Sequence, residues 1–77
     1  MPKIQTFDRK REKERIASEF LFFRQTNLLR QVDLAEELKI SRRSVQMVEA
    51  GITLPGMRTR KRFLELKEKL AKEQAEA

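Results

Sequence analysis

The sequence predicts an all-α fold, a compact domain of four to five helices with extended N- and C-terminal helices. Apolar residues recur at helical spacing in several segments, and no segment shows the alternation of a strand. Most of the remaining residues are charged helix formers. With 77 residues the chain makes one small domain, and it contains no cysteine, so no disulfide stabilises it.

Residues 1–7 are expected to form an N-terminal arm. The domain itself is expected to extend over residues 8–70 and to begin with a long first helix. Pro2 and the lack of periodicity set the arm apart. Asp8 is a suitable N-cap, and the helix is expected to end near Arg24 or Gln25. One face of it is apolar, through Ile16, Phe20 and Phe23.

Two short helices are expected next, over 31–38 and 42–50. The first has an apolar side formed by Leu34, Ala35 and Leu38. Ser41 is a good N-cap for the second, and Gly51 supplies a stop. Val45 and Val48, three residues apart, are expected to face the core.

A last helix is expected to begin near Met57 or Arg58, after the breakers Pro55 and Gly56. It continues into the 60s or 70s. Its apolar face consists of Phe63, Leu66 and Leu70. Residues 71–77 are expected to form a polar C-terminal tail, helical by propensity but frayed.

Composition excludes several classes of function. The sequence shows no nucleophile–base pair, phosphate loop or metal-ligand set, so we expect no enzyme and no cofactor. No apolar run is long enough to span a membrane, and we expect a cytoplasmic protein. The formal charge of +6 suggests a polyanionic partner. This charge lies on the flanks, because residues 1–30 carry +4, residues 31–50 carry −1 and residues 51–77 carry +3.

The segment from about Ile16 to Leu66 resembles the lambda-repressor-like helix-turn-helix domains, which include Cro proteins, controller proteins and xenobiotic-response-element regulators. Their spaced pattern is matched by Gln31, Leu34-Ala35, Ile40-Ser41, Val45, Glu49, Gly51 and Pro55. The resemblance implies that residues 42–50 form a recognition helix in the major groove of DNA.

The resemblance also implies roles for individual residues. The positions expected to contact base edges are Arg42, Arg43, Gln46 and Met47. Those expected to contact phosphates are Gln31, Ser41, Ser44, Arg58, Arg60 and Lys61. Arg24 matches a first-helix arginine that pairs with the glutamate at the position of Glu49.

Some of these residues have plainer interpretations. Arg42 and Arg43 would simply solvate an exposed helix end, although cations at the positive end of a helix dipole are locally unfavourable. Met47 fits either a thymine methyl contact or the edge of the core. A charge run such as residues 58–62 is usually a solvated helix start. The plainer interpretation of Arg24 and Glu49 is that they form no pair and that water solvates each side chain independently.

The sequence departs from the family pattern at two turns and in the last helix. Lys39 and Leu28 stand where glycine is usual, and a left-handed backbone at Lys39 would cost about 1 kcal/mol. After Pro55 the family pattern usually continues with an apolar helix, whereas this sequence continues with basic residues. The orientation of the C-terminal helix is therefore left open.

Together these features predict a sequence-specific regulator of transcription that binds double-stranded DNA at the nucleoid, a repressor or autoregulator of a phage or mobile element. Leu64 and Leu70 are expected to form a homodimer interface that matches paired half-sites. One alternative is an antitoxin-type protein whose main partner is a toxin. Another is a non-specific nucleic-acid binder, which the lack of tyrosine and tryptophan for base stacking disfavours.

Overall fold

The computed structural model describes residues 9–76, which form four α-helices and no strand. The helices are α1 (Arg9–Thr26), α2 (Gln31–Leu38), α3 (Arg42–Glu49) and α4 (Met57–Glu76). The expected all-α architecture is confirmed over this range. The predicted arm and the proposed N-cap Asp8 lie outside the described residues.

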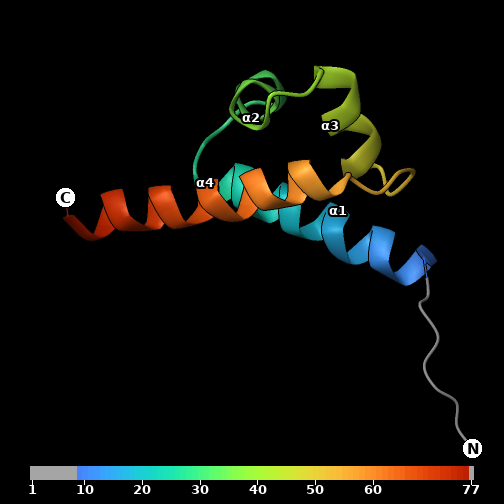
Figure 1. Cartoon of the computed structure of the whole chain (residues 1–77), viewed down its shortest axis with the longest axis horizontal. Coiled ribbons are helices and arrows are strands. Elements are labelled where there is room, and N and C mark those ends of the chain that lie inside the picture. Colours follow the sequence, from blue (N-terminus) through green and yellow to red (C-terminus); the bar gives the residue numbers. More distant parts are fainter. Residues whose placement is uncertain (1–8, 77) are drawn as a thin grey trace, which may run out of the picture.

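The two long helices, α1 and α4, lie side by side, and the two short helices lie together on one side of them (Figure 1). Figure 1 views α2 nearly along its axis and α3 nearly across it, so the two short helices cross steeply. The three-residue connection from Lys39 to Ser41 joins them. α3 packs against both α1 and α2, and α2 also packs against α4.

All four helices contribute side chains to a single core. The ring of Phe63 on α4 lies between two α1 rings, with centroids 4.5 Å from Phe20 and 5.3 Å from Phe23. Leu34, Leu38 and Val45 are fully buried against them. The other members of the core cluster are Ile16, Ala35, Val48 and Leu66. These are the residues at helical spacing, so burial of one apolar stripe per helix accounts for the packing.

Three helices end in the same Schellman motif, in which a left-handed residue redirects the chain. At the end of α2 the Ile40 N–H donates to the Ala35 carbonyl at 3.0 Å, and Lys39 has φ 59°. At the end of α1 the corresponding left-handed residue is Leu28, with φ 57°. Only α3 uses glycine there, Gly51 with φ 75°. The two turns that hold a non-glycine residue in this conformation, at Leu28 and Lys39, therefore carry backbone strain.

We expect Lys39→Gly to raise the free energy of unfolding by about 0.5–1 kcal/mol, because glycine adopts the left-handed conformation without Cβ strain. Lys39 is exposed, so little packing is lost. Urea unfolding followed by circular dichroism measures the change. Glu37→Gly, in the exposed interior of α2, is the control and is expected to destabilise by about 1 kcal/mol. A loss of stability in Lys39→Gly would contradict the assigned strain.

Asp33 stabilises the first turn of α2 through hydrogen bonds to Arg30. Its carboxylate accepts hydrogen bonds from the Arg30 guanidinium at 3.0 Å and from the Arg30 backbone N–H at 2.8 Å. These bonds, the guanidinium first, lower the pKa of Asp33 below its ordinary value of 3.8. A carboxyl group with a lowered pKa in the folded state binds fewer protons there than in the unfolded chain. Its ionised form therefore favours folding.

The contribution of Asp33 is expected to be fully present above about pH 4 and to be lost as the pH falls through the lowered pKa. Asp33→Asn should reduce stability near neutral pH and make the acid limb of the stability curve less steep. Urea unfolding at a series of pH values checks this. Equal acid sensitivity in the variant and the wild type would show that Asp33 titrates alike in the folded and the unfolded chain.

α4 continues to Glu76, so the predicted division into a domain over 8–70 and a frayed tail over 71–77 does not coincide with a helix end. Leu70 packs against the core, and the Gln74 side chain donates to the Asn27 carbonyl oxygen at 3.0 Å. These contacts join the C-terminal half of α4 to the core and to the residue that follows α1.

Candidate nucleic-acid interface

α3 divides its side chains between the core and solvent. Val45 and Val48 are buried, whereas Arg42, Arg43 and Gln46 are exposed. Because residues 42, 43 and 46 share one face of a helix with 3.6 residues per turn, these three polar side chains form a single outward surface.

The start of α3 is fixed by Ser41. Its hydroxyl accepts a hydrogen bond from the Ser44 backbone N–H at 3.0 Å, and the two hydroxyls lie 3.0 Å apart. This cap satisfies one of the free N–H groups at the helix start. Ser41 and Ser44 are both exposed, so their hydroxyls lie on the surface beside the two arginines.

The side chains of Arg42 and Arg43 make no hydrogen bond or ion pair with any other part of residues 9–76. α3 also has no acidic residue in its first turn. Two positive side chains therefore stand at the positive end of a helix dipole without a compensating anion. Such an arrangement is unfavourable in the isolated protein and becomes favourable when an anionic or acceptor-rich surface approaches.

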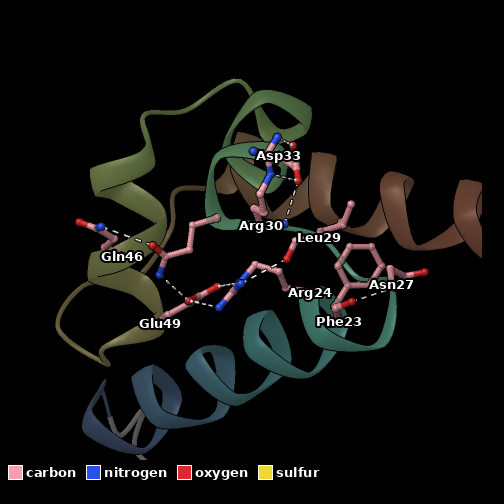
Figure 2. Close-up of polar contacts among 9 residues, drawn as sticks. Phe23, Arg24, Asn27, Leu29, Arg30, Asp33, Gln46 and Glu49 are labelled. Atoms are coloured by element: carbon pink, nitrogen blue, oxygen red, sulfur yellow. Dashed lines mark hydrogen bonds and ion pairs between the residues drawn. The ribbon is translucent and has the colours of Figure 1, made fainter.

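Arg24 and Glu49 join α1 to α3 through a bidentate ion pair (Figure 2). Arg24 Nε lies 2.7 Å and Nη2 lies 3.1 Å from the two Glu49 oxygens. A third donor, Nη1, reaches the Leu29 carbonyl at 3.2 Å. The side chains are 18% and 6% exposed, so this pair is largely shielded from water. It connects the end of α3 to the scaffold helix α1.

Gln31, the first residue of α2, extends this network toward the outward surface. Its Nε2 donates to a Glu49 carboxylate oxygen at 2.9 Å, and its Oε1 accepts from Gln46 Nε2 at 3.3 Å. The sequence pattern suggested only a phosphate contact for Gln31. Bonds to residues 15 and 18 positions away depend on how the helices cross, and no local pattern in the sequence signals them.

An open cleft of about 620 Å³ lies where the starts of α2 and α3 approach the α1–α2 connection. Three of its lining residues are arginines, and the lining consists of Arg24, Leu28, Leu29, Arg30, Gln31, Val32 and Arg42. Arg24 and Arg30 are bound to Glu49 and Asp33. Arg42 is the arginine of this cleft that the fold leaves available.

The basic cluster at the start of α4 is divided by the helical twist. Arg58 and Lys61, three residues apart, are exposed. Arg60 faces α1 instead, with Nη1 3.5 Å from the Glu12 carboxylate. Arg62 donates to the Leu38 carbonyl at 3.2 Å, at the negative end of α2. Of the three α4 residues expected to contact phosphate, Arg60 thus has an intramolecular partner.

The remaining site predictions concern Met47, Leu64 and Leu70. Met47 is half-buried. Leu64 is 56% exposed, whereas Leu70 is half-buried and packs against the core. Leu70 also lines an apolar cleft between α1 and α4 of about 300 Å³. Phe22, at the edge of this cleft, is 72% exposed and was not singled out from the sequence.

Other kinds of site were sought in the part of the chain that the structure describes. Residues 9–76 contain no group of three or more histidine, cysteine, aspartate or glutamate side chains placed to hold a metal ion. None of the helices in this range is long and apolar enough to cross a membrane. A scan of protein-family models and searches of curated proteins and of solved structures each found no match to this chain.

Proposed function

We propose that this chain binds double-stranded DNA in a sequence-specific manner and regulates transcription, with α3 in the major groove. The observation that carries the proposal is the outward surface of α3. It presents Arg42, Arg43 and Gln46 on a helix whose opposite side is buried. The bidentate Arg24–Glu49 pair fixes that helix against α1. The resemblance of residues 16–66 to lambda-repressor-like domains supports the same function.

The chemistry of these side chains suits the major groove. The arginine fork matches the O6 and N7 acceptors of guanine, and glutamine matches the acceptor–donor pair of adenine. Arg58 and Lys61, both exposed, suit the phosphate backbone. In this proposal the Ser41 and Ser44 hydroxyls and the first N–H groups of α2 also contact phosphates.

The test is selection of bound fragments from a randomised duplex library, followed by fluorescence anisotropy with the selected and a scrambled duplex. We expect a recurring motif and a selected duplex bound at least 100-fold more tightly than the scrambled one at about 150 mM salt. Enrichment of no motif, with equal binding of both duplexes, would contradict the proposal and favour non-specific binding.

We also propose a homodimer that uses the exposed side of α4. Leu64→Glu is expected to shift the protein toward monomer, because it places a charge at the centre of an apolar contact. Sedimentation equilibrium measures the shift. Leu64 is a cleaner site than Leu70, whose packing against the core would be lost together with the interface. A mass unchanged by Leu64→Glu would refute an interface through this residue.

A second candidate function is supported by the apolar cleft between α1 and α4. Phe22, Phe23, Leu70 and Ala71 are among its lining residues, and the exposed Phe22 ring offers a contact for an apolar side chain of another protein. An antitoxin-type protein would use such a surface for its toxin.

Expression with neighbouring genes and purification of a complex in fixed stoichiometry tests this candidate. Phe22→Ser is expected to weaken such a complex and leave DNA binding unchanged.

A further inference from the structure

The hydrogen bonds that run from Arg24 to Gln46 have a fixed direction. An ionised carboxylate only accepts, so the Gln31 amide must present its Nε2 group to Glu49. The Gln31 Oε1 then points the other way and accepts from Gln46 Nε2. Arg24, which only donates, holds Glu49 from the opposite side. The charge pair thus determines the orientation of both amides.

The fixed direction of these hydrogen bonds leaves the Gln46 side chain with one orientation at the protein surface. Its Nε2 faces the network, and Figure 2 shows its oxygen at the outer end, pointing away from Glu49. One Nε2 hydrogen is used by Gln31, so the outward groups are one acceptor and one remaining donor. Rotating the amide would bring Gln46 Oε1 against Gln31 Oε1, two acceptors without a proton between them.

We infer that Gln31 is a positioning residue that sets the base preference of Gln46, an inference that rests on the proposed function. In the major groove adenine presents an N6 donor beside the N7 acceptor, which matches the outward acceptor and donor of Gln46. Guanine presents two acceptors, O6 and N7, and needs the opposite amide orientation. The network therefore selects adenine and rejects guanine at the base that Gln46 faces.

Gln31→Met tests the inference because methionine keeps the length of the side chain and removes the amide. Gln46 is then free to rotate and offer both Nε2 hydrogens to guanine. Gln25→Met is the matched control, since Gln25 is exposed on α1 and takes no part in the network. Circular dichroism first establishes that each variant is folded at the temperature of the binding measurement.

The measurement is competition binding with duplexes in which each position of the selected site carries each of the four bases. For the wild type and Gln25→Met we expect one position where adenine is preferred over guanine by about tenfold or more. Gln46→Ala should abolish that preference and identify the position. Gln31→Met should reduce it to about threefold or less, with guanine binding improved relative to adenine.

A purely structural role for Gln31 would weaken binding to all duplexes alike and leave the ratio unchanged. In the Gln46→Ala background, Gln31→Met should have no further effect on the ratio. An adenine preference that depends on Gln46 but persists in Gln31→Met would overturn this inference and leave the proposed function standing. A guanine preference through Gln46 would also overturn it. A wild-type protein without any base preference would instead overturn the proposed function.

Discussion

Replacement of Glu49 with alanine is expected to destabilise the fold by about 2–4 kcal/mol. Removing one partner of a buried ion pair leaves the other charge without compensation, at a cost of about 3–5 kcal/mol in fully buried cases. Glu49 is 6% exposed and Arg24 is 18% exposed, so some water reaches the arginine and lowers that cost. A domain of this size has a total stability of about 4–12 kcal/mol, so the loss is a large part of it.

Urea unfolding followed by circular dichroism measures the change. Glu19→Ala is the control, because Glu19 is 41% exposed and its ion pair with Arg15 joins two residues of the same helix. This control is expected to leave the unfolding midpoint nearly unchanged. Arg24→Ala combined with Glu49→Ala should be less destabilising than the sum of the single changes, by about 1–3 kcal/mol. Additive effects would show that the two side chains contribute independently.

The consequence for the site is that α3 depends on α1 for its position. α3 has eight residues, too short to be stable alone. It is held by Val45 and Val48 in the core and by Glu49 at its end. In the proposed function, loss of Glu49 should therefore reduce DNA affinity beyond the effect of unfolding, because it allows the outward arginines to change direction.

The limits of the two short helices were predictable from local signals, those of α2 in full and those of α3 to within one residue. Ser41 and Gly51 bracket α3, and the apolar spacing of Leu34, Ala35 and Leu38 defines α2, whose limits are the same in the sequence analysis and in the structure. The strain at Lys39 and Leu28 was also visible, because a turn that normally contains glycine implies a left-handed backbone. Caps and turns depend on a few neighbouring residues, which is why sequence patterns locate them.

The remaining features depend on contacts between distant segments. Arg60 looked equivalent to Lys61 in the sequence, but the position of α1 gives Arg60 a carboxylate partner in Glu12. The bond near the end of α4 between Gln74 and Asn27 joins residues 47 positions apart. The orientation of Gln31 toward Glu49 likewise requires the steep crossing of α2 and α3. None of these contacts leaves a periodic pattern in the chain.

Arg43→Ala is expected to weaken binding to the selected duplex by about 1–3 kcal/mol, with a much smaller effect on a scrambled duplex. Arg43 is exposed in the first turn of α3. A bidentate contact from it to guanine is made only where that base is present. The motif obtained by selection with the variant should lose its preference at one position and keep the others. Fluorescence anisotropy with both duplexes measures the two affinities.

Lys61→Ala is the matched comparison, because it also removes one positive charge from an exposed helical position. A phosphate contact is independent of sequence, so this variant should weaken binding to both duplexes alike and reduce the salt slope by about one. The general electrostatic loss is common to the two substitutions. The ratio of selected to scrambled affinity therefore isolates base recognition. If Arg43→Ala changed that ratio no more than Lys61→Ala, Arg43 would be a phosphate contact, and recognition would have to come from other side chains of α3.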